Sequence, residues 1–212
     1  NFKIDDDFIL NLKNNFENIS LSKSYSGEGI IISNETAKGV ILKGVNKNEK
    51  KIIEFFDKFS SKYNIEDFKS NNIYIGSELA FDLGLKKGDT LNLMSSAFIM
   101  TPLGSLPKQE NFKVAGIFNT GFLDFDQNIA FVNIEDALSI FEKEKDDQNV
   151  EIYLDDPLRA NIYKNKIQKI NQNYFIYTWS DLNKSLFSAL KVERNVMFII
   201  LTLIIVVAAF NI

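Results

Sequence analysis

Apolar residues recur along the chain with two spacings, and these spacings divide it into helices and strands. A repeat of three to four residues places apolar side chains on one face of a helix, whereas short apolar runs bounded by glycine or polar residues are typical of buried strands. The predicted helices are 8–20, 46–63, 77–85, 134–144 and 159–170, and the predicted strands are 21–33, 38–45, 71–76, 89–95, 111–119, 127–133, 150–156 and 174–179.

Several residues mark where these elements bend or end. Gly27 and Gly29 lie inside a predicted strand and indicate a bulge or a turn there. Ser77 is placed to cap a short helix that ends at Gly84. The segment from Asp155 to Pro157 is expected to form a turn that starts the next helix, because proline is tolerated in the first helical turn.

The last segment has the composition of a membrane span. Residues 195–212 carry no charge and are apolar on every helical face. At about 1.5 Å per residue they cover roughly 27 Å, close to the roughly 30 Å of a bilayer core. We expect one continuous helix from Ser180, its N-cap, into the bilayer, with Lys191 and Arg194 near the boundary. A span that breaks off without a polar flank indicates that the chain is cut from a longer protein.

The order of the elements predicts an α+β fold with two lobes and a membrane anchor. Helices and strands mix at both ends of the water-soluble part, and a strand-rich insert bearing a long hairpin loop lies between them. The expected parts are 1–87 and 133–179 for the mixed α/β lobe, 88–132 for the insert with a loop at 98–107, and 180–212 for the helix that spans the membrane from about 195.

The loop at 98–107 is unusually apolar for a hairpin tip. Such tips commonly hold two to five polar or glycine residues, whereas this one is about a dozen residues long. Pro102 and Pro107 stiffen it, and neither can donate to a strand ladder. Two readings are open: a rigid recognition element that loses little entropy on binding, or a loop that folds back onto its own domain. The large apolar side chains are Phe98, Ile99, Met100, Leu103 and Leu106.

Composition excludes several kinds of chemistry. The chain has no cysteine and no histidine, which excludes disulfides, thiolate nucleophiles, imidazole metal ligands and the Ser-His-Asp triad. A net charge of −4 argues against nucleic acid as a partner. The stretch 84–90 lacks the spacing of a phosphate-binding loop, so a helix end and a turn at Gly88 are expected there.

We expect the clustered carboxylates to lie in solvent-exposed loops. Residues 5–7 and 124–128 each contain several carboxylates, but neither stretch has the alternating ligands, turn glycine and distal glutamate of a calcium loop. No metal or cofactor site is therefore expected. A membrane-tethered enzyme that uses two facing carboxylates stays open as an alternative function.

Four stretches together resemble the LolC branch of the lipoprotein-releasing ABC transporters, or the related LolF type. The pattern TP-x-G-x-x-P-x-Q and the AAFNI ending are specific, whereas L-G-L-x-x-G-D is shared with MacB-like periplasmic domains generally. The stretches are "IYIGSELAFDLGLKKGDTLNLMS", "TPLGSLPKQENFKVAGIF", "FVNIEDALSIF" and "ALKVERNVMFIILTLIIVVAAFNI".

This resemblance implies a location, a role and a set of partners. The chain is expected to be a periplasmic domain of a bacterial inner-membrane subunit, followed by a transmembrane helix. It is expected to have no enzymatic activity, because ATP is bound and hydrolysed by a separate LolD-type subunit. The other implied partners are a LolE-type subunit or a second identical subunit, membrane lipid, the lipoprotein substrate and the carrier LolA. The lipoprotein is extracted from the inner membrane and passed to that carrier.

The resemblance also implies which residues contact the carrier. The family grips LolA with a protruding loop called the hook, which corresponds to Phe98 to Pro107 and transfers most closely at Pro102, Leu103, Gly104 and Pro107. Gln109 matches a supporting surface at the base of the loop. Where the family often has basic residues, this chain has Asn92 and Glu110, so the apolar part of the contact transfers best.

An alternative from the same superfamily is a MacB-like or FtsX-like permease that serves efflux or the regulation of a hydrolase. In either case the helix from Ser180 is expected to transmit movement between the membrane and the domain, because neither glycine nor proline interrupts it.

Overall fold

The computed structural model describes residues 6–16, 19–33, 36–60, 65–102 and 104–210. The chain forms two compact units that divide between Tyr153 and Leu154. The first unit contains α1 (Asp6–Asn15), β1 (Ile19–Ser33), β2 (Thr36–Val45), α2 (Lys50–Phe59), β3 (Asn72–Gly76), α3 (Ser77–Asp82), β4 (Thr90–Thr101), β5 (Gly104–Phe118), α4 (Leu123–Asn128), β6 (Ile129–Asn133), α5 (Ile134–Ile140) and β7 (Asn149–Leu154), which ends at the division. The second contains α6 (Ala160–Ile170), α7 (Trp179–Leu182) and α8 (Lys184–Phe210), and short 3-10 turns lie at Ile65–Asp67, Lys145–Asp147 and Pro157–Arg159.

Six strands of the first unit close into a barrel. The seven-stranded sheet runs in the order β2-β6-β3-β5-β4-β1-β7, and β2 also pairs with β1. β1 pairs antiparallel with β4 at one end of the six-stranded run and also pairs antiparallel with β2 at the other end. The additional pairing therefore closes the run into a ring. Closure pairs most strand edges within the barrel, and unpaired edges are the places where sheets aggregate. β7 lies outside the ring, against β1.

The barrel interior is the main hydrophobic core. Alternate residues of all six strands point inward, and side chains of α3 and α5 join the same cluster. Gly27 of β1 leaves room for this packing, because a Cβ there would lie 2.5 Å from the Phe141 ring. The pairing of β1 with β2 runs without interruption through Gly27 and Gly29, so the bulge predicted at these glycines is wrong. Gly27 serves close approach instead.

A second core lies outside the barrel, under α2. Phe56 and Ile52 of α2 are buried against Tyr74 and Phe131, which point outward from β3 and β6. This cover extends to Val45 of β2 but not to the outward residues farther along β1 and β2: Ile30 is 38% exposed and Ile41 is 44% exposed. One side of the barrel is therefore packed, and the β2–β1–β4 side is open.

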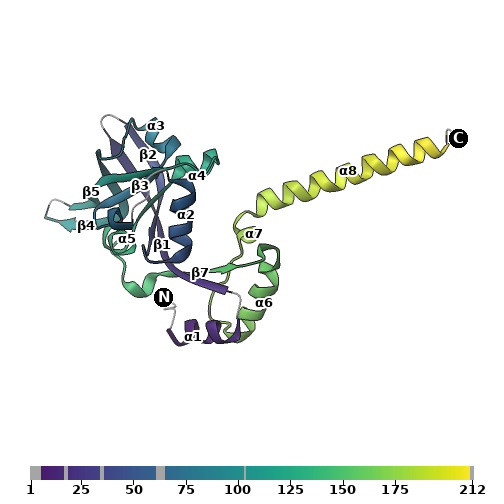
Figure 1. Cartoon of the computed structure of the whole chain (residues 1–212), viewed down its shortest axis with the longest axis horizontal. Coiled ribbons are helices and arrows are strands. Elements are labelled where there is room, and N and C mark those ends of the chain that lie inside the picture. Colours follow the sequence, from purple (N-terminus) through teal and green to yellow (C-terminus); the bar gives the residue numbers. More distant parts are fainter. Residues whose placement is uncertain (1–5, 17–18, 34–35, 61–64, 103, 211–212) are drawn as a thin grey trace. The chain divides into compact units, whose positions relative to one another are not determined.

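Residues 88–132 are rich in strands, as the sequence predicts, because they contain β4, β5 and β6. These strands pair with β1, β2 and β3 and complete the same barrel, where the sequence indicates a separate lobe. What extends beyond the barrel is the end of the β4–β5 hairpin, which Figure 1 shows projecting from the unit.

Local sequence signals in the first unit have mixed outcomes. Gly84 and Gly88 have φ of +64° and +100°, which confirms the helix end and the turn predicted there. Ser77 begins α3 but makes no cap, since Gly76 holds the N-cap position. Helix α1 ends at Asn15, well before the predicted residue 20. Of the predicted carboxylate loops, 124–128 is wrong, because it forms α4.

Asp126 explains why α4 forms. Its carboxylate is 2% exposed and accepts hydrogen bonds from the backbone N–H groups of Thr120 and Gly121 and from the Thr120 hydroxyl. The charge therefore fixes the preceding turn instead of facing solvent. Of the other cluster, residue 5 lies outside the described residues, and Asp6 begins α1.

The second unit begins with a 3-10 turn and α6. Asp156 accepts a hydrogen bond from Leu158 N at 3.0 Å, which confirms the turn predicted around Pro157. The strand predicted at 174–179 is wrong, because residues 174–178 form neither helix nor strand and α7 begins at Trp179. In that stretch Phe175, Tyr177 and Trp179 are exposed.

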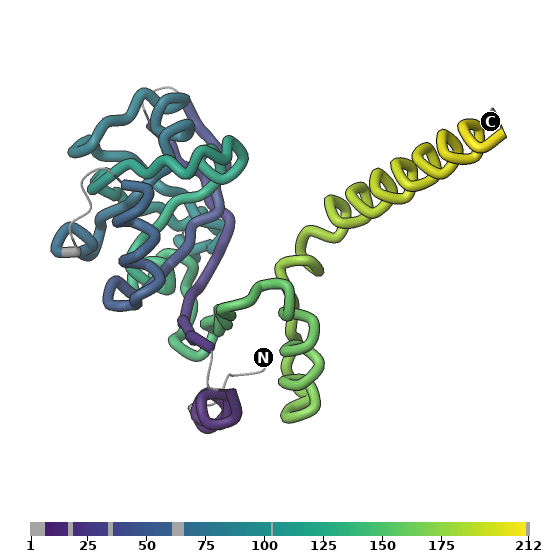
Figure 2. The backbone as a smooth tube through the Cα atoms, turned by 45° about the vertical axis from the view of Figure 1, so that its right-hand side comes forward, coloured from purple at the N-terminus to yellow at the C-terminus, as the bar shows by residue number. Residues whose placement is uncertain are grey.

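The helix that follows begins earlier than predicted and is interrupted. Thr178, not Ser180, is the N-cap, and its hydroxyl and backbone N–H both hydrogen-bond Asp181 in a capping box. Lys164 of α6 lies 2.8 Å from the same carboxylate. The Lys164 ammonium and the Thr178 donors lower the pKa of Asp181. At Asn183, φ of −109° and ψ of 37° break the helix, so α7 and α8 are separate elements, as the turn in Figure 2 shows.

Within the described part of the chain, α8 is the one helix long and apolar enough to cross a membrane. It has 27 residues and a mean hydropathy of 2.1 over its most apolar window, none of which is buried. This agrees with the span expected from about residue 195.

Candidate functional site

The segment predicted as a long loop is a strand ladder that continues almost to its tip. β4 and β5 remain paired through Phe98 with Pro107, Ile99 with Leu106 and Thr101 with Gly104. Two residues, Pro102 and Leu103, separate the last paired positions in the sequence, and Leu103 lies outside the described residues. Pro107 is tolerated in a ladder because, among the described residues, no further strand pairs with this part of the hairpin. The tip of the hairpin lies within the predicted loop at 98–107, but most of that segment is paired strand and not loop.

The apolar side chains of this hairpin face solvent. Phe98 is 60% exposed, Met100 is 86% exposed and Leu106 is 52% exposed; Ile99, Pro102 and Gly104 are also exposed, and Pro107 is half-buried. The reading in which the segment folds back and buries these residues is therefore wrong. We call Phe98–Pro107 the hook hairpin from here on.

The register divides the hook hairpin into two apolar faces. Residues opposite one another in a ladder point to the same side, and neighbours along a strand point to opposite sides. Phe98, Met100 and Pro107 consequently share one face, while Ile99 and Leu106 share the other. A partner can contact large apolar side chains on both sides of a thin ribbon.

The base of the hairpin is attached to the end of α5. Between Met94 and Phe98 the register shifts, so that the three residues 95–97 oppose Lys108 alone. Ser95 is 5% exposed and its hydroxyl donates to the Ile140 carbonyl at 2.8 Å. The Lys108 ammonium donates to the Ser139 carbonyl, also at 2.8 Å. Both partners are carbonyls of the last turn of α5, where the negative end of the helix dipole attracts a cation; the Ser139 carbonyl also accepts from Glu142 N at 3.0 Å. These two contacts fix the direction in which the hairpin leaves the barrel.

The predicted supporting residues lie on the outward side of the barrel, next to the hook hairpin. Asn92 Nδ2 donates to Asn111 Oδ1 at 3.1 Å across the β4–β5 ladder. The other amide atom, Asn92 Oδ1, is buried and has no hydrogen-bond partner among the described residues. Gln109 is exposed and lies opposite Met94. The structure thus brings Asn92 and Gln109 onto one surface with the base of the hairpin, while their role stays a prediction.

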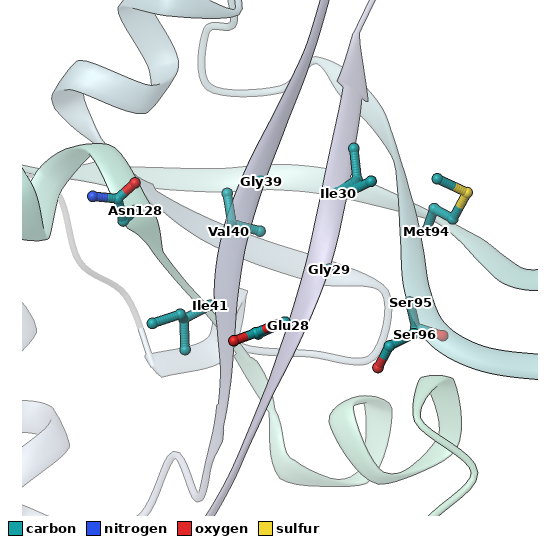
Figure 3. Close-up of a pocket in the computed structure, with 10 residues that line it drawn as sticks. All are labelled: Glu28, Gly29, Ile30, Gly39, Val40, Ile41, Met94, Ser95, Ser96 and Asn128. Atoms are coloured by element: carbon teal, nitrogen blue, oxygen red, sulfur yellow. The ribbon is translucent and has the colours of Figure 1, made fainter.

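A groove of about 560 Å³ adjoins this surface on the open side of the barrel (Figure 3). In Figure 3 the side chains of Ile30, Ile41 and Met94 stand out from β1, β2 and β4 along the groove. Glu28 is the one charged residue among its lining residues, which are Glu28, Gly29, Ile30, Gly39, Val40, Ile41, Met94, Ser95, Ser96 and Asn128.

Asp136, an acidic residue outside the groove, has a structural role. Burial raises the pKa of Asp136, which accepts hydrogen bonds from the Ser70 hydroxyl at 2.6 Å and from Asn71 N at 2.9 Å. Within the described ranges, no group of three or more Asp and Glu residues is arranged to hold a metal ion. Glu28, the carboxylate in the groove, has no second carboxylate beside it in the lining. Two facing carboxylates, which the enzyme alternative requires, are not found in this groove.

Sequence reasoning missed the groove and the anchor of the hairpin. The sequence gives no sign that Ile30, Gly39 and Ile41 line a groove. A strand that is buried on both faces and a strand that is exposed on one face can both consist of apolar residues. Ser95 and Lys108 form contacts across 45 and 31 residues of chain, which no local pattern indicates.

Comparison with known proteins places the chain beside transmembrane subunits of the lipoprotein-releasing system. No family model matches it. The transmembrane protein LolC of Buchnera aphidicola is 32% identical over 212 residues, covering 92% of this chain and 49% of that protein. LolC of Neisseria meningitidis is 30% identical over 191 residues, covering 88% and 46%. LolE of Haemophilus influenzae is 26% identical over 196 residues, covering 91% and 47%. The chain spans about half the length of these relatives.

Two solved structures share the fold at low sequence identity. The periplasmic region of MacB from Actinobacillus actinomycetemcomitans superimposes with a TM-score of 0.52 and 12% identity, covering 88% of this chain and 83% of that one. The extracellular domain of the ABC-type transporter YknZ from Gram-positive bacteria gives 0.51 and 14%, covering 83% and 87%. The resemblance predicted from the sequence is therefore confirmed: the chain is similar to the LolC-type transmembrane proteins of the lipoprotein-releasing system over about half their length, and it has the fold of a MacB-type periplasmic domain.

Proposed function

We propose that this chain is the periplasmic part, with one membrane span, of an ABC-transporter permease subunit in the bacterial inner membrane. The subunit releases lipoproteins from that membrane and hands them to the periplasmic carrier LolA through the hook hairpin. In this proposal the chain has no enzymatic activity and binds no cofactor, because a separate LolD-type subunit binds and hydrolyses ATP. The other half of the membrane complex is a LolE-type subunit or a second copy.

The observation that carries this proposal is the exposure of Phe98, Met100 and Leu106 on a hairpin whose base is fixed to α5. Exposing such side chains has a hydrophobic cost of about 25 cal/mol per Å², so a contiguous exposed set marks a contact surface. A carrier of acylated proteins needs an apolar cavity for the acyl chains. A stiff apolar ribbon has a shape and chemistry that fit the mouth of such a cavity.

The test is capture of a purified LolA-type carrier from the same genome by the 212-residue chain in lipid nanodiscs. Truncated anchors of an interface commonly cost about 2 kcal/mol, so Phe98→Ser and Met100→Ser are each expected to weaken binding roughly thirtyfold. Phe81→Ser is the matched control: this phenylalanine is 83% exposed on α3, outside the hook hairpin, and its loss is expected to leave binding unchanged.

The other permeases with this fold predict a different result. An efflux or hydrolase-regulating subunit has no reason to capture a lipoprotein carrier. If the unchanged chain fails to bind the carrier at micromolar concentration, or if the Phe98 and Phe81 variants behave alike, the assignment to lipoprotein release is wrong.

A further inference from the structure

We infer that Met100, near the tip of the hook hairpin, is a site of reversible oxidation that controls binding of the carrier. This inference rests on the proposed function and adds a regulation to it. Hydrogen peroxide converts the thioether of Met100 into a sulfoxide, which weakens the contact with the carrier, and reduction of the sulfoxide restores that contact.

Met100 carries the one sulfur atom of this chain that is largely exposed and lies outside the membrane span. The chain contains no cysteine and three methionines, which are Met94, Met100 and Met197. Met100 is 86% exposed, whereas Met94 is half-buried and its sulfur accepts a hydrogen bond from Gln109 Nε2 at 3.6 Å. Met197 lies in the apolar part of α8, which we expect inside the bilayer. Because oxidation depends on access to the sulfur, Met100 is expected to react first.

The ladder of the hook hairpin itself leaves this sulfur uncovered. Met100 pairs with Ser105, and residues opposite one another in a ladder point to the same side. The serine side chain is too short to cover a methionine. The Thr101 hydroxyl donates to the Gly104 carbonyl at 2.7 Å and closes the ladder next to this pair. The exposure of Met100 therefore belongs to a paired strand position and not to a loose loop.

Oxidation changes the chemistry of the face that the proposed function assigns to the carrier. Phe98 lies two residues before Met100 on the same strand and shares its face. The methionine side chain is flexible and apolar and adapts to irregular surfaces, whereas its sulfoxide is polar. Burying the sulfoxide oxygen against an apolar surface that offers no donor is unfavourable, so we expect oxidation of Met100 to weaken the contact at least about tenfold.

The reaction requires a peroxide in one direction and a dithiol in the other. The thioether sulfur attacks one oxygen of hydrogen peroxide, so that an S–O bond forms and the O–O bond breaks. The second oxygen leaves as water with both hydrogen atoms; sulfur has lost two electrons and the peroxide has gained them. In the reverse step, which a methionine sulfoxide reductase catalyses, a dithiol supplies two electrons and two protons and becomes a disulfide, and the sulfoxide oxygen leaves as water.

The first test asks which sulfur reacts, and it does not involve the carrier. The 212-residue chain in lipid nanodiscs is treated with hydrogen peroxide, and peptide mass spectrometry follows the gain of one oxygen at each methionine over time. We expect Met100 to be oxidised severalfold faster than Met94 or Met197. Equal rates at Met94 and Met100 would overturn the inference whatever the function of the chain.

The second test compares binding of the purified LolA-type carrier before and after peroxide treatment. The affinity of the unchanged chain is expected to fall at least about tenfold, and to recover after treatment with a methionine sulfoxide reductase and dithiothreitol. Met94→Leu, which removes the other sulfur outside the span, is expected to lose affinity by the same factor on oxidation. Met100→Leu has no sulfur at this position, so peroxide is expected to leave the affinity of this variant at its own untreated value.

The outcomes separate this inference from the proposed function. If the chain oxidised at Met100 binds the carrier as tightly as the untreated chain, the inference is wrong and the hook assignment stands. If peroxide weakens binding by Met100→Leu as much as binding by the unchanged chain, oxidation acts elsewhere and the inference fails. If the untreated chain does not bind the carrier, both proposals are wrong.

Discussion

Glu151 shows how single residues hold β7 against the barrel. Its carboxylate accepts hydrogen bonds from the Ser24 hydroxyl at 2.7 Å and from the Tyr153 hydroxyl, and the Lys43 ammonium lies 2.7 Å away. Burial alone raises a carboxyl pKa, but the Lys43 charge and the three donors outweigh it, so the pKa of Glu151 is lowered from 4.5. Burial and the neighbouring carboxylate raise the pKa of Tyr153, which stays protonated as a donor.

The first prediction concerns the pH dependence of this contact. Because the pKa of Glu151 is lower in the folded state, its stabilisation is fully present above about pH 4.5 and is lost as pH falls through the folded value. Lys43→Met leaves a partly buried charge without its partner, and we expect it to reduce the free energy of unfolding by about 2 kcal/mol at pH 7. Urea unfolding followed by circular dichroism measures the difference. The double variant with Glu151→Gln is expected to recover part of the loss, and an equal loss at pH 3 and pH 7 would show that the charge pair is not responsible.

At the scale of elements, the hook hairpin depends on its attachment to α5. Among the described residues, the ribbon beyond Ser95 pairs with itself alone, and an isolated two-stranded hairpin is marginally stable in water. Ser95 joins it to the barrel by donating to the Ile140 carbonyl and accepting from Ala97 N at 3.2 Å. One buried hydroxyl therefore satisfies two backbone groups at the shift in register.

The second prediction is that Ser95→Ala loosens the hairpin. Leaving the buried Ile140 carbonyl and the part-buried Ala97 N–H without this partner is expected to lower the free energy of unfolding by about 1–3 kcal/mol. Backbone amides of residues 98–101 are expected to exchange with deuterium faster than in the unchanged chain. Ser96→Ala is the control, because Ser96 is exposed and a surface change of this kind costs within about 0.5 kcal/mol. Equal exchange in the two variants would contradict the role given to Ser95.

The same elements show what the sequence can and cannot specify. Apolar runs in the sequence predicted where the strands of the barrel lie, because a strand whose side chains are buried contains a short local run of apolar residues. The run at 174–179 is equally apolar but has no strand partner among the described residues, and Phe175, Tyr177 and Trp179 are exposed. The two prolines and the apolar residues identified the hook segment in the sequence, but they did not predict that its two strands pair almost to the tip. A proline excludes a strand only where a neighbouring strand needs its N–H group. Predicting the groove would have required the order of the strands in the sheet, and that order is set by contacts between residues far apart in the sequence.

At the scale of the whole molecule, α8 connects the second unit to the membrane. Its 27 residues extend about 40 Å, which exceeds the roughly 30 Å bilayer core, and its charged residues all precede Asn195, so we expect the charged part to stand outside the membrane. The expected single helix is broken at Asn183. The ring of Trp179 packs on Phe187 with centroids 4.8 Å apart, and Asn183 Nδ2 donates to the Trp179 carbonyl at 2.8 Å. These contacts span the break and hold α7 on the first turn of α8.

The third prediction concerns force transmission through α8 in the assembled transporter, and it rests on the proposed function. Between Lys184 and Phe210 the helix contains neither glycine nor proline, so it is expected to transmit movement between the membrane and the periplasmic domain. Leu190→Pro removes a helical hydrogen bond outside the membrane and introduces a kink that costs about 3 kcal/mol. We expect ATP hydrolysis to continue while the lipoprotein released per ATP falls severalfold in proteoliposomes. Leu190→Ala loses the same side chain without a kink and is expected to keep hydrolysis and release coupled. If the proline variant releases lipoprotein with unchanged yield per ATP, the force does not pass through this helix.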